Sequence, residues 1–245
     1  MKKVYLIPNF VTTANMFCGF YSIIASIQSD YWVAAWAILL AGVFDMLDGR
    51  IARLAKATSA FGEEYDSMSD LLSFGLAPAL LLYQWALSSY GRLGWMVAFL
   101  YVAGSALRLA RFNVNTDVIN KKYFQGLPTP VSAGWVSTFV IFCHGFYFQS
   151  EIETNTLALG MTLLLSFLMI SNVPFPSFKE VNWRSRVPRS LLLLIFILFF
   201  VIAVKPEVTL FLLNSLYILI SLCFAIYQLK TGKKFKEVFG YSDEE

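Results

Sequence analysis

The sequence has little charge and few of the side chains that dominate soluble active sites. Only 14% of its 245 residues are charged, whereas a soluble domain carries about 25%. It has one histidine, His144, and its three cysteines, Cys18, Cys143 and Cys223, lie in separate apolar segments. This spacing fits neither a zinc site nor a disulfide pair. A lone histidine argues against histidine-based catalysis. The low fraction of charged residues argues against a separate soluble domain.

Long apolar runs take the place of charge. Hydrophobic residues make up 58% of the chain, and apolar runs of about 18 residues or more recur along it. The fold class that this pattern predicts is an all-α polytopic membrane protein. Eight transmembrane helices are expected, over residues 10–29, 32–54, 62–88, 92–112, 130–149, 155–173, 187–204 and 207–229. We expect residues 1–230 to form one transmembrane domain and residues 231–245 a short cytoplasmic tail.

Basic residues are divided unevenly between the two sides of this predicted bundle. With the N-terminus in the cytoplasm, only Arg92 and Lys205 of the 19 lysines and arginines fall on the outer side. Cytoplasmic loops normally carry such an excess of positive charge, so both termini are expected in the cytoplasm. The basic residues then serve topology and lipid headgroups, and we expect no nucleic-acid partner. The compact chain suits a bacterial plasma (inner) membrane.

Four aspartates interrupt the apolar background. Asp45 and Asp48 lie three residues apart, and Asp66 and Asp70 lie four apart, so each pair shares one face of its helix. A tight turn over residues 56–60 joins the two predicted helices. The two acidic faces can therefore meet at the inner membrane boundary. Ionised carboxylates are expensive at membrane depth, which makes these four residues candidates for a functional site.

Carboxylates placed this close repel one another unless protons or cations neutralise them. Oxygen-only ligands favour hard cations such as Mg²⁺, Mn²⁺ or Ca²⁺, and the lack of a nearby histidine or cysteine argues against zinc and copper. A pair of such cations is the usual clamp for displacement at phosphorus. The alternative is a pair of helix-end ion pairs, Asp45 with Arg50 and Asp48 with Arg53. Four aspartates at matching positions favour the metal site.

Residues 45–70 read D-x-x-D-G-x-x-A-R, then eight residues, then G-x-x-x-D-x-x-x-D. This pattern resembles the defining motif of the CDP-alcohol phosphotransferases, with every fixed position filled. The resemblance implies a helical bundle, with two divalent cations (Mg²⁺ or Mn²⁺), that transfers a phosphatidyl or related group from a CDP-activated lipid to an alcohol and releases CMP. It implies that Asp45, Asp48 and Asp66 bind the metals, with Asp70 as a shared ligand or the general base. It also implies a CDP-lipid pocket lined by Gly49, Ala52, Arg53 and Gly62.

The first predicted span carries a polar stripe at Asn9, Thr12 and Asn15. These side chains face the same side near the inner end of the helix. They could hydrogen-bond the nucleotide of the CDP-lipid, or they could hold neighbouring helices together. The sequence leaves both interpretations open.

Further segments resemble the serine-using branch of the same family. They are residues 8–19, 107–113, 124–130 and 171–179. The resemblance implies that CDP-diacylglycerol and L-serine are the substrates, at an active site on the cytoplasmic face. Arg108 and Arg111 lie three apart on one helix face, and arginine suits bidentate binding of a carboxylate or a phosphate. Both arginines could instead be positively charged anchors at the cytoplasmic boundary.

Three other acceptor alcohols are open alternatives: glycerol 3-phosphate, inositol phosphate and choline. A phosphorylated acceptor would need a denser basic pocket, and choline would favour an aromatic cage.

The alternative to an enzyme is a cation transporter that uses the aspartates as a relay. Transport sites lie near the bilayer centre, whereas these aspartates are expected within about two helical turns of the boundary. By analogy with the family we expect a homodimer.

Overall fold

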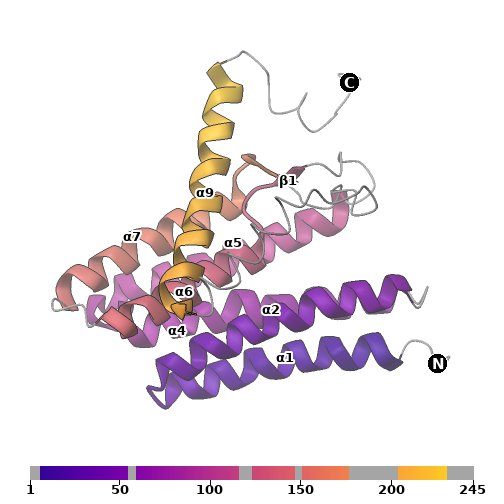
Figure 1. Ribbon diagram of the computed structural model, residues 1–245, viewed down its shortest axis with the longest axis horizontal. Helices are drawn as coiled ribbons and strands as arrows, with labels where there is room; N and C mark the ends of the chain where they lie inside the picture. The colour runs from indigo at the N-terminus through magenta and orange to yellow at the C-terminus, as the bar shows by residue number, and fades with distance from the viewer. Residues whose placement is uncertain (1–5, 55–58, 116–122, 147–150, 177–203, 231–245) are drawn as a thin grey trace.

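Helices make up nearly all of the described chain in the computed structural model (Figure 1), which covers residues 6–54, 59–115, 123–146, 151–176 and 204–230. The elements, in chain order, are α1 (Leu6–Ile27), α2 (Tyr31–Leu54), α3 (Ala60–Asp70), the π-helix η2 (Leu71–Leu76), α4 (Ala77–Trp85), the 3-10 helix η3 (Leu87–Tyr90), α5 (Arg92–Asn115), β1 (Tyr123–Gln125), α6 (Thr129–Phe146), α7 (Glu151–Ile170), β2 (Pro174–Pro176) and α9 (Pro206–Lys230).

Five of the described helices, α1, α2, α5, α7 and α9, are long and apolar enough to cross a membrane. This result confirms the predicted helical membrane protein. The predicted span 62–88 is not one regular helix, because α3, the π-helix η2 and α4 follow one another there. The predicted span 130–149 corresponds to the 18-residue helix α6. The predicted span 187–204 lies almost wholly outside the described residues, so the count of eight stays a prediction.

The prediction of a purely helical chain missed one small feature. Strands β1 and β2 pair antiparallel, with Phe124 opposite Phe175. Each strand has only three residues, too short a stretch for an alternating pattern to show in the sequence. The pair joins the segment before α6 to the segment after α7.

Small side chains let α1 and α2 lie side by side, as Figure 1 shows. Ala34, Ala35 and Ala41 of α2 are fully buried and share a core with Cys18 and Ala25 of α1. Small residues permit close approach of helix backbones in a membrane, where van der Waals contact replaces the hydrophobic effect as the main attraction. The close contact fixes the ends of both helices relative to each other.

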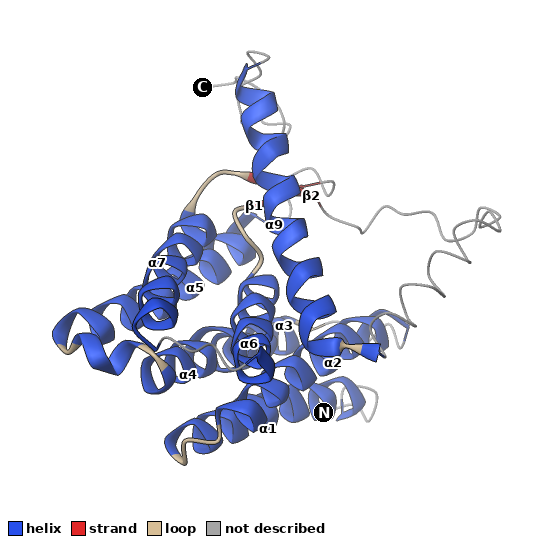
Figure 2. Ribbon diagram, turned by 60° about the vertical axis from the view of Figure 1, so that its left-hand side comes forward, coloured by secondary structure: helices blue, strands red, loops and turns tan. Residues whose placement is uncertain are grey.

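A second core holds the other half of the bundle. Tyr101 of α5, Leu165 of α7 and Trp135 of α6 are buried in it, and Phe211 of α9 packs against it. The last helix, α9, rises past the two strands (Figure 2), where the Tyr217 hydroxyl donates to the Pro176 carbonyl at 3.1 Å. Helix α9 therefore braces the strand pair from one side.

The π-helix η2 lies directly after Asp70 and against α1. A Cβ added at Gly19 of α1 would lie 2.7 Å from the Cα of Ser73, so only glycine permits this approach. The Ser73 hydroxyl donates to the Asn15 carbonyl at 3.0 Å. Single π-turns inside α-helices are frequent at functional sites, and this one sets the position of α3 relative to α1.

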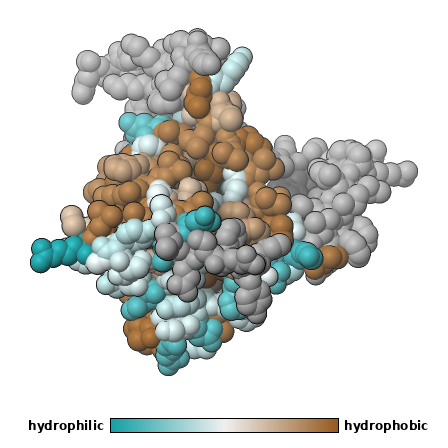
Figure 3. All heavy atoms as spheres, turned by 90° about the vertical axis from the view of Figure 1, so that its left-hand side faces the viewer, coloured by the Kyte–Doolittle hydropathy of each residue, from teal (hydrophilic) through white to brown (hydrophobic). Residues whose placement is uncertain are grey.

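The surface of the bundle divides into apolar and polar parts. Seen from the end where the α1–α2 turn lies, hydrophobic residues cover much of the upper part of the molecule and hydrophilic residues gather in the lower part (Figure 3). Large apolar side chains are exposed along α5 and α9, among them Phe99, Leu107 and Leu219. Such exposure suits contact with lipid rather than with water.

Candidate metal centre and its cavity

Three of the four predicted aspartates meet at one point. Asp45, Asp48 and Asp66 each place one carboxylate oxygen within 4.8 Å of the others. Asp45 and Asp48 come from α2 and Asp66 comes from α3, two helices that follow each other in the chain. The fourth, Asp70, is not part of this group of three but lines the same cavity as Asp45 and Asp66. We call Asp45, Asp48 and Asp66 the acidic triad.

Helix α1 supplies hydrogen bonds that orient two of these carboxylates. The Thr12 hydroxyl lies 3.1 Å from Asp48 Oδ2, in position to donate, and the Asn15 side-chain amide donates to Asp70 Oδ1 at 3.2 Å. Thr12 and Asn15 are both buried. Of the two interpretations of the polar stripe on the first span, these contacts favour a helix-to-helix role at these two positions.

Two serine side chains position α3, one by bonding to α1 and one by capping the start of α3. The Ser69 hydroxyl, fully buried, donates to the Thr12 carbonyl at 3.1 Å. The Ser59 side chain caps the start of α3 by accepting from the Gly62 amide at 3.1 Å, a usual way to satisfy the first amides of a helix. The triad is therefore assembled from helices whose relative positions are fixed by hydrogen bonds.

A cavity of about 730 Å³ opens beside the triad. Its described lining comes from α2, α3, α5, β1 and the start of α6, and comprises Asp45, Met46, Gly49, Arg50, Glu63, Glu64, Asp66, Ser67, Asp70, Arg108, Leu109, Phe112, Asn113, Phe124, Pro128 and Pro130. The lining combines acidic, basic, amide and apolar groups, as a site for a charged headgroup with a lipid tail requires.

The two predicted arginines of α5 take different positions. Arg108 lines the cavity and is only 7% exposed. Its Nη1 donates to the Thr129 hydroxyl at 3.0 Å, and its guanidinium carbon lies 5.5 Å from the centre of the Phe112 ring. Its Nε is buried with no hydrogen-bond partner among the described residues. Arg108 therefore lines the cavity with a guanidinium that the described residues satisfy only in part.

Arg111 does not belong to the described lining of the cavity. Its Nη1 and Nη2 donate to five acceptors at distances of 2.8–3.2 Å. These acceptors are the carbonyl oxygens of Gln125, Met169, Ile170 and Ser171 and the side-chain oxygen of Asn172. The contacts fasten β1 and the end of α7 to α5, an arrangement that we call the Arg111 clamp.

The other predicted pocket residues lie near the triad. Gly49 lines the cavity, and a Cβ added there would meet no atom within 4 Å, which leaves open space for a ligand. At Gly62 an added Cβ would lie 3.8 Å from Asn9 Oδ1, so these two residues are neighbours. Helix α2 continues through Ala52 and Arg53, but their side chains lie outside the described part of the chain.

Sequence reasoning passed over several residues of the lining. Glu63 and Glu64 both line the cavity, although acids in the first turn of a helix are common without a functional role. Ser67 and Asn113 line it too and bond to each other, with the Asn113 amide donating to Ser67 Oγ at 2.9 Å. The only signal for Asn113 was its place in segment 107–113, which resembles the serine-using branch of the family.

The triad suits a divalent cation. Its ligands are all carboxylate oxygens, the donor type that Mg²⁺ and Mn²⁺ prefer. Asp66 Oδ1 is buried without a hydrogen-bond partner among the described residues, and a buried carboxylate oxygen left in this way is costly. A cation between the three oxygens would satisfy Asp66 and remove the repulsion within the triad.

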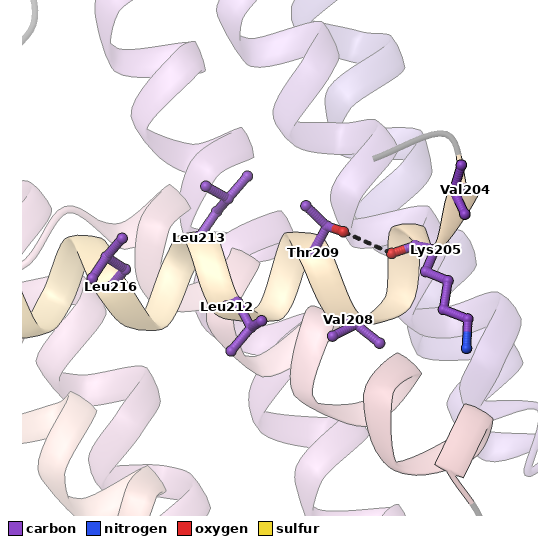
Figure 4. Close-up of a pocket in the computed structure, with 7 residues that line it drawn as sticks. All are labelled: Val204, Lys205, Val208, Thr209, Leu212, Leu213 and Leu216. Atoms are coloured by element: carbon purple, nitrogen blue, oxygen red, sulfur yellow. Dashed lines mark hydrogen bonds between the residues drawn. The ribbon is translucent and has the colours of Figure 1, made fainter. Parts of the chain in front are cut away.

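A second cavity, of about 520 Å³, has a different character. Its described lining lies just before and along the first turns of α9 and comprises Val204, Lys205, Val208, Thr209, Leu212, Leu213 and Leu216 (Figure 4). The Thr209 hydroxyl is already used, because it donates to the Lys205 carbonyl at 2.9 Å. An almost wholly apolar lining offers no group for catalysis at phosphorus.

Comparison with known proteins supports the interpretation of the motif. The chain is 36% identical over 219 residues to a CDP-diacylglycerol–serine O-phosphatidyltransferase of Helicobacter pylori strain J99. The matched region covers 89% of this chain and 90% of that protein. It is 38% identical to the archaetidylserine synthase of Methanothermobacter thermautotrophicus (69% of each chain) and 34% identical to the Saccharomyces cerevisiae CDP-diacylglycerol–serine O-phosphatidyltransferase (74% and 62%). Residues 5–227 match the family described as CDP-alcohol phosphatidyltransferase, so this chain belongs to that family.

Proposed function

We propose that this protein transfers the phosphatidyl group of CDP-diacylglycerol to the hydroxyl of L-serine. The observation that carries the proposal is the acidic triad beside a cavity with both charged and apolar lining. Family membership supports the CDP-lipid donor, and the names of the three relatives support an amino-acid acceptor, serine. The products are phosphatidylserine and CMP.

The proposed reaction is a single displacement at phosphorus. The serine oxygen forms a bond to the phosphorus that carries the diacylglycerol. The bond from that phosphorus to the oxygen shared with the CMP phosphate breaks, and this oxygen leaves with CMP. The proton of the serine hydroxyl is transferred to a base. In-line positioning and charge neutralisation supply most of the catalysis in phosphoryl transfer.

Asp45, Asp48 and Asp66 are proposed to hold the divalent metal, with Mg²⁺ or Mn²⁺ as candidates and two ions as the expected number. Metal bound there would neutralise the diphosphate and polarise the bond that breaks. Asp70 lies outside the group of three and accepts from Asn15, which fits the role of general base better than that of a ligand to the same cation. Asn15 would keep the second carboxylate oxygen of Asp70 turned to the serine hydroxyl.

The CDP-lipid is proposed to occupy the α2 and α3 side of the cavity. Gly49 leaves open space there, and Gly62, at the start of α3, lies next to Asn9. Ala52 and Arg53 complete the motif, with Arg53 proposed to bind the diphosphate. Thr12 acts through Asp48 as a positioning residue, since its hydroxyl bonds the carboxylate.

We place the protein in a bacterial plasma membrane with both termini and the cavity on the cytoplasmic side. The distribution of basic residues supports this orientation, and a free amino acid is available only from the cytoplasm. Residues 1–230 would form one catalytic domain, 231–245 a cytoplasmic tail, and the protein would act as a homodimer by analogy with the family.

An acceptor panel tests the proposed function. Purified protein in detergent micelles is given CDP-diacylglycerol and Mn²⁺ or Mg²⁺ with radiolabelled L-serine, glycerol 3-phosphate, inositol phosphate or choline. We expect labelled lipid and CMP with serine alone, and neither product after chelation of the metal. Lipid product from another alcohol but not from serine would overturn the proposed acceptor, and full activity in chelator would overturn the metal site.

A further inference from the structure

Two arginines one helical turn apart on α5 differ in how their donors are used. Arg111 donates to five acceptors of the protein. Among the described residues Arg108 makes one hydrogen bond, to the Thr129 hydroxyl, and its Nε is buried without a partner there. The guanidinium of Arg111 is therefore used by the fold, whereas that of Arg108 is left with unused donors.

The unused donors of Arg108 are buried, which destabilises the protein unless a ligand binds them. The side chain is 93% buried, since only 7% of it is exposed, and an unsatisfied buried donor on a charged group destabilises a protein more than a neutral one does. The carboxylates of Asp70 and Asp45 offset part of this charge, but no hydrogen bond joins them to the guanidinium among the described residues. Arg108 lines the same cavity as Asp66 and Asp70, so an incoming anionic group can reach it there.

The orientation of Arg108 is fixed before any ligand arrives. Thr129, at the start of α6, holds Nη1 from one side. The Phe112 ring lies 5.5 Å from the guanidinium carbon, within the range of a cation–π contact. A guanidinium held in one plane presents its fork for two parallel hydrogen bonds to a planar anion.

We propose that Arg108 is the specificity-determining residue of the acceptor site, where its guanidinium binds the carboxylate of the amino-acid substrate. This inference rests on the proposed function, which supplies an acceptor with both a hydroxyl and a carboxylate. Arg111 has no part in binding and acts as a structural clamp. The serine hydroxyl is then directed from the α5 wall toward the donor phosphorus near the acidic triad.

The shared chemistry that Arg108 can bind is a pair of anionic oxygens, from the acceptor carboxylate or from the donor diphosphate. The carboxylate is favoured because divalent cations held by the triad on α2 and α3 would already neutralise the diphosphate. No metal is proposed beside the acceptor's carboxylate, so that group needs a hydrogen-bond donor from the protein. Arg108 is attached to a different wall, formed by α5 and the start of α6, where a second substrate can lie beside the first.

Steady-state kinetics show whether Arg108 binds the acceptor carboxylate or the donor diphosphate. The variants to compare are Arg108→Gln, Arg108→Lys and Arg111→Lys. Serine and CDP-diacylglycerol are varied in turn, and serinol, which has an alcohol in place of the carboxylate, serves as a second acceptor. For Arg108→Gln we expect the KM for serine to rise roughly 100-fold, because one partner of a buried charge pair is lost. The KM for CDP-diacylglycerol should stay within about twofold of its original value, given that the triad is intact.

The preference for serine over serinol is the sharper readout. It should collapse in Arg108→Gln and persist in part in Arg108→Lys, which keeps the charge but loses the fork. In Arg111→Lys the serine-to-serinol preference should be unchanged while the melting temperature falls. Because Arg108→Lys conserves charge and approximate volume, it keeps the test valid if Arg108→Gln does not fold.

Three results would overturn the inference. The first is a rise in the KM for CDP-diacylglycerol in place of that for serine, which would assign Arg108 to the diphosphate. The second is an unchanged preference for serine over serinol in both Arg108 variants. The third is loss of that preference in Arg111→Lys alone. Failure of the proposed function is a separate outcome, because the unaltered protein would then make no lipid from serine.

Discussion

The acidic triad and the Arg111 clamp both place charge inside the bundle, but they treat it in opposite ways. In the triad, three carboxylates gather within 4.8 Å and Asp66 Oδ1 has no hydrogen-bond partner among the described residues. In the clamp, the Arg111 guanidinium donates to five acceptors. Buried polar groups are normally satisfied by the protein itself. The difference supports the proposal that a ligand completes the triad, whereas the clamp is satisfied by the protein itself.

The two regions also differ in what surrounds the charge. The triad lies on open space, since a Cβ at the adjacent Gly49 would meet no atom within 4 Å. In the clamp a Cβ at Gly126 would lie 2.7 Å from Arg111 Nη2. Open space beside a carboxylate oxygen without a hydrogen-bond partner suits ligand binding, and close packing around a satisfied guanidinium suits a structural role. The clamp thereby holds β1, and with it Phe124, against the cavity.

The largest effect should come from removal of one triad charge. Asp66→Asn keeps the shape of the side chain but loses the charge that a divalent cation needs. We expect the rate of CMP release to fall by roughly 100-fold or more, since loss of a metal contact costs several kcal/mol in the transition state. Mn²⁺ should no longer raise the melting temperature, because a cation that binds only the folded protein stabilises it by mass action.

Asp30→Asn is the matched control for this variant. Asp30 lies in the turn between α1 and α2, where its side chain accepts from the Val33 amide at 3.3 Å, and asparagine caps a helix as well as aspartate does. CMP release and the Mn²⁺-dependent shift should both be unchanged. An Asp66→Asn protein that still releases CMP at the original rate would show that the triad is not the metal site.

A smaller effect, on stability rather than on chemistry, is expected in the clamp. Gly126 has φ +79° and its amide donates to the Val173 carbonyl at 2.9 Å. Gly126→Ala places a side chain in the left-handed region, which costs about 1–2 kcal/mol, and forces it against Arg111. We expect a loss of about 2 kcal/mol or more in unfolding free energy, measured as a lower melting temperature in detergent.

Gly160→Ala separates a local effect from a general effect of alanine. Gly160 lies within α7, and a Cβ there would meet no atom within 4 Å. Alanine is the better helix former by up to about 1 kcal/mol, so this variant should be as stable as the unaltered protein or more so. Equal melting temperatures for the Gly126→Ala and unaltered proteins would show that the clamp contributes nothing to stability.

The sequence was sufficient to predict that the triad aspartates lie close together, because their positions depend on residues near one another in the chain. Helical spacing puts Asp45 and Asp48 on one face, and the short connection to α3 brings Asp66 to them. The helical membrane class could also be predicted, because a low fraction of charged residues and long apolar runs are visible directly in the sequence. The break of the predicted span 62–88 at the π-helix η2 was out of reach, because it depends on how Gly19 and Ser73 pack between α1 and η2.

The two arginines of α5 show where sequence reasoning stops. Arg108 and Arg111 have the same chemistry and lie on the same predicted face, so the sequence could not tell a binding role from a structural role. What separates them is the location of the acceptors, at Thr129 for one and around Met169 and Gln125 for the other. Those contacts join segments that are 14 to 58 residues away in the chain, and no local pattern encodes them.

The smallest effect should come from the residue that supports the triad from α1. Thr12→Val is nearly isosteric and removes the hydroxyl that lies 3.1 Å from Asp48 Oδ2. A hydrogen bond to a charged group contributes about 1.5–3 kcal/mol, and loss of such an orienting partner weakens a metal site about tenfold or more. We expect about tenfold weaker Mn²⁺ binding, read from the concentration that gives half of the maximal melting-temperature shift, with the fold preserved.

Thr13→Val is the neighbouring control, because it removes a hydroxyl that bonds elsewhere. Thr13 Oγ1 donates to the Asn9 carbonyl at 2.7 Å and shares a hydrogen bond with the Tyr65 hydroxyl at 2.9 Å. Its loss should lower stability slightly and leave Mn²⁺ binding unchanged. Equal Mn²⁺ affinities in the Thr12→Val and Thr13→Val proteins would mean that α1 supports the triad only by packing. In that case the contrast between a triad completed by a cation and a clamp completed by the fold would rest on α2 and α3 alone.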